Sequence, residues 1–265
     1  MKLGVFQFSP AFGDKEGNLG RIGSALGSAE GDLVVLPELC TTGYRFVARE
    51  EAFDLSEPVP GGRTTEILSG ICRDRGLHLA LGMAERCGDA CYNSAVLIGP
   101  GGWIGTYRKV HLFQDEKRWF SPGSEGFPVF DLGFASVGLM VCFDWIFPEA
   151  ARTLALSGAD LICHPSNLVL PYCPDAMITR SIENRVFTAT ANRTGAEERG
   201  GAGRLVFIGS SQITDPSGKV LVRMGREEEG LSFVQIDPQR ARDKRITPMN
   251  HLWEDRKADQ YGVRL

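Results

Sequence analysis

The chain has 265 residues, of which 43% are hydrophobic and 23% are charged, a composition typical of one large soluble α/β domain or two small ones. Its 33 acidic residues outnumber its 29 basic residues, and the net charge of -4 argues against general attraction to nucleic acid or to an anionic membrane. No apolar run reaches the ~18 residues of a membrane span, and the N-terminus becomes polar too early for a signal peptide. The seven cysteines include no Cys-x-x-Cys pair, which favours reduced thiols in a cytoplasmic protein over a disulfide framework.

Apolar runs bounded by turn signals predict the strands of the first half of the chain. They span residues 3–8, 33–36, 77–85, 91–98 and 103–109, and the glycine-rich turn between the last two predicts a hairpin. Helices are expected at residues 17–29 and 64–75, the second ended by Gly76. Residues 111–126 are irregular and polar, and a loop of this length inside a compact domain is often functional.

The second half continues the pattern. A strand pair at residues 129–132 and 135–141 ends at Cys142, and Pro148 can begin a helix that Gly158 ends. A further helix is expected at residues 175–185. Further strands are expected at residues 160–163, 186–191, 207–214, 219–224 and 231–236. The segment 197–204 is predicted to be a mobile surface loop, and the polar tail from about residue 240 either wraps a neighbouring subunit or frays.

The predicted strands outnumber the helices, and the helices fall between strand pairs. No repeat or linker divides the chain. This order predicts a single α/β domain over residues 1–265, with two sheets inside and helices outside, as a four-layer α-β-β-α sandwich.

Three reactive side chains end or follow apolar strands, namely Glu38, Lys109 and Cys142. Ligands of α/β sheets bind at strand ends, so the three could share one pocket. A thiolate is the nucleophilic form of cysteine, an ammonium stabilises it, and a carboxylate can take the thiol proton and later activate water. With Lys109 and the backbone N–H of Phe143 as oxyanion donors, acyl transfer at a carbon–nitrogen bond follows. Taken singly, a buried structural cysteine and two solvated charges explain the same residues.

The segments around these residues resemble the signatures of the nitrilase superfamily, thiol-dependent carbon–nitrogen hydrolases with a Glu-Lys-Cys triad. The matching segments are Pro-Glu (37–38), Tyr-Arg-Lys-Val-His-Leu (107–112) and Val-Cys-Phe-Asp-Trp-Ile-Phe-Pro-Glu (141–149). The likeness extends through residues 115–123, where Glu116 falls on the family's second glutamate, and through residues 180–185 and 191–195. The cysteine segment and residues 164–168 are most similar to small archaeal and bacterial aliphatic nitrilases or amidases.

The resemblance implies a mechanism in which Glu38 deprotonates first Cys142 and later water. Cys142 attacks the substrate carbon, ammonia leaves, and a thioester forms. Lys109 and the Phe143 N–H hold the anionic centre, and Glu116 positions Lys109 or the substrate. No metal or organic cofactor is implied.

The resemblance also implies a homodimer or larger homo-oligomer. Its interface would contain the helices near residues 148–158 and 175–185 and the tail from about residue 240.

The substrate pocket is less well defined by the sequence. Asn167 could contact the substrate or cap a turn. Four aromatic residues could form an apolar rim suited to a small aliphatic amide or nitrile, although each suits a core position as well: Phe113, Phe143, Trp145 and Tyr172.

The residues after the cysteine leave the substrate class open. Nitrilases proper often carry Trp-Glu where this chain has Phe143 and Asp144. Carbamoylases of amino acids tend to place arginines where this chain has Trp145 and Ile146. Amide, nitrile and N-carbamoyl substrates therefore all stay possible.

Three other interpretations compete with a thiol hydrolase. A binding protein could keep the fold without turnover. A metal site could form from Cys163, His164 and Cys173, although their spacing matches no standard zinc pattern. A serine hydrolase is disfavoured, because no Gly-x-Ser-x-Gly occurs.

Overall fold

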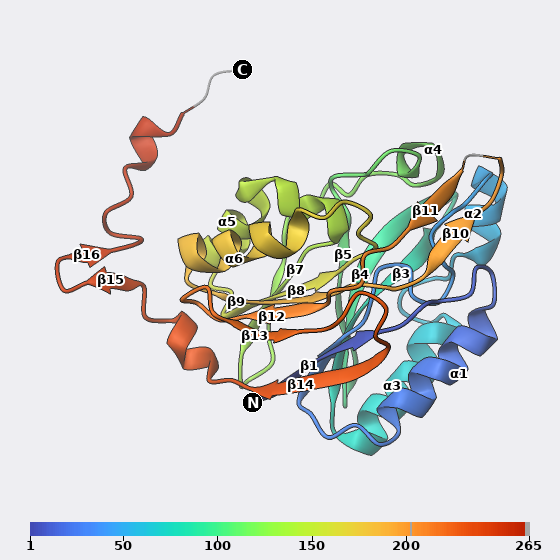
Figure 1. The fold of residues 1–265 in the computed structure, drawn as a ribbon, viewed down its shortest axis with the longest axis horizontal. Helices are drawn as coiled ribbons and strands as arrows, with labels where there is room; N and C mark the ends of the chain where they lie inside the picture. The colour runs from blue at the N-terminus through green and yellow to red at the C-terminus, as the bar shows by residue number, and fades with distance from the viewer. Residues whose placement is uncertain (202, 263–265) are drawn as a thin grey trace.

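The computed structural model describes residues 1–201 and 203–262, so residue 202 of the predicted loop and residues 263–265 of the tail lie outside the described part. Within that part, two six-stranded sheets form the centre of the molecule (Figure 1). The first sheet has the order β14-β1-β2-β3-β4-β5. Its strands are β1 (Lys2–Gln7), β2 (Leu33–Val35), β3 (His78–Cys87), β4 (Ala90–Gly99), β5 (Gly102–Arg108) and β14 (Gly230–Gln235).

The second sheet has the order β13-β12-β9-β8-β7-β6. Its strands are β6 (Val129–Asp131), β7 (Ser136–Leu139), β8 (Leu161–Pro165), β9 (Phe187–Ala191), β12 (Gln212–Thr214) and β13 (Val220–Arg223). In each sheet three neighbouring strands are parallel, namely β1-β2-β3 and β7-β8-β9. The two sheets therefore share one arrangement, a parallel centre with antiparallel strands at its sides.

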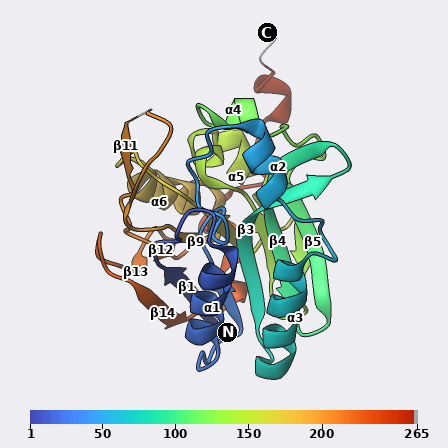
Figure 2. The ribbon, with the colours of Figure 1, turned by 90° about the vertical axis from the view of Figure 1, so that its right-hand side faces the viewer.

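Alternating residues on each strand separate two apolar layers, because successive side chains point to opposite faces of a sheet. From β2, Leu33 and Val35 join the layer between the two sheets, whereas Val34 faces α1 (Lys15–Leu26) and α3 (Arg63–Arg75). The helices α5 (Pro148–Leu156) and α6 (Cys173–Asn184) cover the outer face of the second sheet (Figures 1 and 2). The predicted four-layer α-β-β-α sandwich is confirmed.

Several elements begin or end where the sequence predicts. Helix α3 ends at Gly76, whose φ of 67° is the left-handed conformation that glycine adopts at low cost. Pro148 occupies the first turn of α5, where its missing N–H is harmless.

Other elements differ from the prediction. The predicted loop at 197–204 is largely a hairpin, β10 (Ala196–Glu198) with β11 (Arg204–Val206). The predicted strand at 207–214 pairs only as β12, because Gly209 and Ser210 have φ values of 55° and 58° that break the extended backbone. Two short helices were not predicted, α2 (Arg49–Leu55) and α4 (Glu116–Trp119).

The face formed by α5 and α6 carries exposed apolar side chains, including Leu156 at 45% and Ile182 at 49% exposure. The tail, with β15 (Arg245–Thr247) and β16 (Asn250–His251), extends away from the sandwich (Figure 1). The homodimer stays a prediction that sedimentation velocity can test.

Among the described residues, the structure contains no helix with the length and apolar character needed to cross a membrane.

Candidate active site

Strand direction brings the predicted carboxylate and amine to one edge of the first sheet. Glu38 lies shortly after β2, and Lys109 directly follows β5. Since β2 is parallel to β3 and β5 lies two antiparallel steps from β3, β2 and β5 run in the same direction. Their carboxyl ends therefore meet at the same edge. In the second sheet, Cys142 and Asn167 follow the parallel strands β7 and β8 in the same way.

Lys109 is held between two carboxylates in the interior. Its Nζ donates to Glu38 Oε1 at 2.7 Å and to Glu116 Oε1 at 2.8 Å, and the side chains of Lys109 and Glu38 are 0% exposed. Asn93 Nδ2 donates to the same Glu38 oxygen at 2.7 Å, and the Tyr44 hydroxyl donates to Glu116 Oε1 at 2.8 Å. Because an ammonium has three N–H donors, these two carboxylates leave one donor of Lys109 for another acceptor.

The Cys142 thiol lies in the electric field of the same groups. Burial raises the pKa of Cys142 well above its usual value, and the charge of Glu38 raises it further, while Lys109 lowers it. The resting sulfur is therefore a thiol that needs a base at the moment of attack. Glu38 Oε2 is buried and has no hydrogen-bond partner in the described part of the chain, which leaves it free to accept that proton.

The charges in this cluster do not balance. Burial alone would lower the pKa of Lys109, but the charges of Glu116 and Glu38 outweigh it and raise this pKa above its usual range. Burial raises the pKa of Glu116 to about 7, against the opposing charge of Lys109. One cation faces two carboxylates, so Glu116 keeps a proton up to neutral pH.

This imbalance predicts that the stability of Glu116→Gln, relative to that of the parent, rises with pH. The folded protein holds the Glu116 proton more tightly than the unfolded chain, so folding loses free energy as the pH rises from the usual pKa of 4.5 through about 7. A glutamine has no proton to lose there. Urea unfolding should show the free energy of unfolding of the variant, relative to that of the parent, rising by about 3 kcal/mol between pH 4.5 and pH 8. A stability difference that does not change with pH would contradict this charge count.

The backbone at Cys142 is strained and held by side chains that the sequence analysis did not assign. Cys142 has a φ of 41°, which is uncommon for a residue with a side chain. It begins a 3₁₀ turn, Cys142–Ile146. The buried Asp144 carboxylate accepts from the Val141 N–H at 2.8 Å and the Tyr107 hydroxyl at 2.8 Å, and its other oxygen lies 2.7 Å from His111 Nδ1.

His164, considered above as a metal ligand, lies on the other side of this turn. Its Nε2 is 2.8 Å from the backbone oxygen of Cys142. Within the described residues, no group of three or more His, Cys, Asp or Glu side chains is arranged to hold a metal ion.

A narrow cavity of about 20 Å³ opens beside the sulfur. Its wall contains four of the predicted site residues besides Cys142, namely Phe113, Phe143, Trp145 and Asn167, together with Leu168, Val169 and Leu170. Tyr172 is absent from this wall and is 64% exposed, so the structure does not bring it to the cavity. Both polar atoms of the Asn167 side chain are buried without a partner among the described residues, in a wall that is otherwise mostly apolar.

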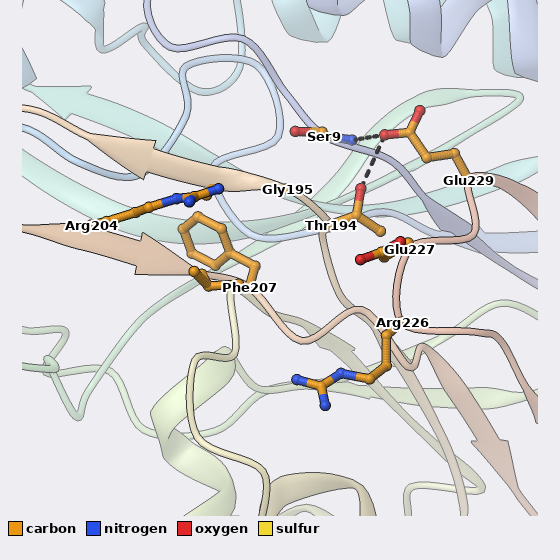
Figure 3. A pocket seen from close by; sticks show the side chains of 10 residues that line it. Ser9, Thr194, Gly195, Arg204, Phe207, Arg226, Glu227 and Glu229 are labelled. Carbon is orange, nitrogen blue, oxygen red and sulfur yellow. Dashed lines mark hydrogen bonds between the residues drawn. The ribbon is translucent and has the colours of Figure 1, made fainter.

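A much larger cavity, of about 740 Å³, lies beside the β10–β11 hairpin (Figure 3). The Ser9 N–H and the Thr194 hydroxyl both donate to Glu229 at its wall. None of the predicted site residues lines it. Its Phe207 ring makes an edge contact with Tyr44, with 5.9 Å between the ring centres. The cavity therefore lies next to the residue whose hydroxyl donates to Glu116.

Comparison with known proteins gives three consistent findings. A sequence profile described as carbon-nitrogen hydrolase matches residues 2–246. A nitrilase from Pyrococcus abyssi is 48% identical and covers 98% of this chain and 99% of its own. An N-carbamoylputrescine amidase from Solanum lycopersicum is 31% identical over 89% of this chain and 85% of its own length.

A solved structure adds chemistry to the likeness. It is a variant of the amidase from Nesterenkonia sp. AN1, with the acetamide moiety of fluoroacetamide covalently added at its active-site cysteine. It superposes with a TM-score of 0.80 at 29% identity, over 98% of this chain and 95% of that chain.

Proposed function

The chain belongs to the carbon–nitrogen hydrolase family of the nitrilase superfamily, and from this we propose that it hydrolyses a small aliphatic amide or nitrile through a cysteine thioester. It is a hydrolase of carbon–nitrogen bonds. The proposal adds the nucleophile, the base and the substrate class. The observation that supports it most is the buried Lys109, paired with Glu38 and Glu116, three charged groups that all act on the Cys142 thiol.

In the first half of the proposed reaction, Glu38 Oε2 takes the thiol proton while the sulfur bonds to the carbonyl carbon of an amide. The carbonyl electron pair moves to oxygen, where the remaining N–H of Lys109 and the backbone N–H of Phe143 stabilise the oxyanion. When the oxyanion collapses, the carbon–nitrogen bond breaks. The nitrogen receives the proton from Glu38 and leaves as ammonia, and the acyl group stays on sulfur as a thioester.

In the second half, Glu38 takes a proton from water as the water oxygen attacks the thioester carbon. Collapse breaks the carbon–sulfur bond, the sulfur recovers the proton, and the carboxylic acid leaves. A nitrile enters one step earlier, since attack at its carbon gives a thioimidate that water converts to the same thioester. Glu116 accepts from Lys109 as Glu38 does, and the two carboxylates together fix the direction of its free N–H.

The narrow apolar wall around the sulfur favours a small, weakly charged acyl group. Phe113, Phe143 and Trp145 contribute no charge, and Asn167 supplies a neutral donor and acceptor. A charged amino-acid substrate would lose hydration there without an opposite charge to replace it. This argument ranks N-carbamoyl amino acids below aliphatic amides and nitriles.

Ammonia release tests the proposal directly. We expect turnover of butyramide or butyronitrile, with kcat/KM at least about 10-fold above that of an N-carbamoyl amino acid of similar length, since burying an uncompensated charge costs more than ~1.4 kcal/mol. A preference for the N-carbamoyl compound would reject the aliphatic substrate class. If no compound releases ammonia while an electrophile still labels Cys142, the substrate lies outside these three classes.

A further inference from the structure

A buried histidine contacts the backbone of the predicted nucleophile from the neighbouring strand. His164 lies in β8 and is 0% exposed. Its Nε2 is 2.8 Å from the Cys142 carbonyl oxygen and 3.1 Å from Ser166 Oγ. Its Nδ1 is 3.0 Å from Thr190 Oγ1 in β9. Both ring nitrogens therefore have partners, although none of them is a substrate-facing group.

These partners assign the proton on the ring. A carbonyl oxygen only accepts hydrogen bonds, so the hydrogen sits on Nε2 and Nδ1 accepts from the Thr190 hydroxyl. Burial lowers the pKa of His164 to about 4, so the ring is neutral near pH 7 and keeps this single N–H. The Nε2–H is thus committed to the Cys142 carbonyl.

The Cys142 carbonyl and the Phe143 N–H belong to one peptide group. That group is planar and trans, so its C=O and N–H point in opposite directions and rotate together. A hydrogen bond that fixes the carbonyl on one side therefore fixes the N–H on the other. Phe143 is the second residue of the 3₁₀ turn, where the N–H has no partner within the turn and is available to an external acceptor.

The strained conformation of Cys142 makes such an anchor necessary. At a φ of 41° the backbone lies in a sparsely populated region, and neighbouring groups must hold it there. The Asp144 carboxylate accepts from the Val141 N–H and so fixes the Met140–Val141 peptide, one peptide unit before the one that precedes Cys142. It does not contact the peptide that follows Cys142, and His164 does.

We propose that His164 is a positioning residue for the oxyanion site, and that its Nε2–H aims the Phe143 N–H at the developing oxyanion. The inference rests on the proposed function, because it assumes acyl transfer at Cys142. It assigns His164 no proton transfer and no contact with substrate. Its effect is on the transition state, where the oxyanion exists, and not on the reactivity of the sulfur itself.

Two reactions of the same cysteine separate these effects. Amide hydrolysis passes through an oxyanion, whereas alkylation by iodoacetamide forms a carbon–sulfur bond and releases iodide without one. In His164→Leu we expect kcat for the best substrate to fall about 100-fold, the usual effect of losing one oxyanion donor. KM and the iodoacetamide rate at Cys142 should each change less than about 3-fold, because neither depends on that donor.

Two further variants and a control make the test independent of folding failure. His164→Gln, whose amide nitrogen can reach the place of Nε2, should recover at least about 10-fold of the lost kcat. Thr190→Val keeps the ring but removes the partner of Nδ1. It should lower kcat by about 3- to 10-fold, the effect expected from losing one hydrogen bond. His78→Gln is the matched control, since His78 Nδ1 lies 3.2 Å from a backbone oxygen, that of Asp32, outside the site. It should leave kcat unchanged.

Two outcomes overturn the inference. Unchanged kcat in both His164→Leu and Thr190→Val would remove His164 from the reaction. A parallel loss of hydrolysis and alkylation would mean that the ring places the sulfur or the fold instead. Neither outcome resembles a failure of the proposed function, which would appear as turnover retained in Cys142→Ala.

Discussion

Cys142→Ala should lower ammonia release by about 10⁴-fold or more, because the methyl group cannot form the covalent intermediate. The remaining groups can still bind substrate and polarise it, but Glu38 has no thiol to deprotonate. The measurement is ammonia production at saturating amide or nitrile, with enzyme at high concentration so that a residual rate is visible. Retained turnover within about 10-fold of the parent would reject Cys142 as the nucleophile.

The control for this variant is Cys72→Ala. Cys72 is another buried thiol, in α3, and it packs in the apolar layer between that helix and the first sheet. Its loss removes a buried sulfur without touching the site, so activity should stay within about 2-fold while stability falls by about 1 kcal/mol. Loss of activity in both variants would point to packing rather than chemistry.

The sequence predicts the positions of the reactive groups better than their environment. Glu38, Lys109 and Cys142 could be found because each follows an apolar run, and such runs become strands that end near ligands. Two of their strands also run in the same direction, a fact that depends on pairing and not on local pattern. The family resemblance supplied the remaining step, that these distant segments share a site.

The supporting groups were not predicted, because their partners lie far away along the chain. Tyr107 reaches Asp144 across 37 positions, and Asn93 reaches Glu38 across 55. Nothing in the local periodicity around Asp144 distinguishes a buried acceptor from a solvated carboxylate. Tertiary contacts with Tyr107 and His111, together with the nearby Val141 N–H, surround this carboxylate and let it hold the strained turn.

The errors in the fold have a similar cause. Residues 197–204 are rich in glycine and charge, which describes a loop, yet β10 and β11 form a hairpin in which Glu197 is only 7% exposed. The Glu197 carboxylate accepts from the Tyr44 and Arg45 N–H groups. This buried charge is compensated by an ion pair with the buried Arg193. The N–H contacts also tie the hairpin to the loop that carries Tyr44, so the hairpin helps to place the residue that donates to Glu116.

The role of Glu38 as a base leads to the second large effect. Glu38→Gln should lower kcat by about 10³-fold, since a neutral amide oxygen cannot accept the thiol proton or activate water. The shape of the site should survive, because the amide oxygen can still accept from Lys109 Nζ and from Asn93 Nδ2, as Oε1 does now. Ammonia release and the rate of iodoacetamide labelling at Cys142 are the two measurements.

The direction in which the labelling rate changes separates a base from a structural carboxylate. After burial, the charge of Glu38 is the largest cause that raises the pKa of the Cys142 thiol. Removing that charge lowers this pKa, so the thiolate fraction at a given pH rises and labelling in Glu38→Gln should be equal or faster. A structural carboxylate would instead lower both rates together. Glu57→Gln, at a buried carboxylate that accepts from the Thr64 N–H and hydroxyl away from the sulfur, should change neither rate.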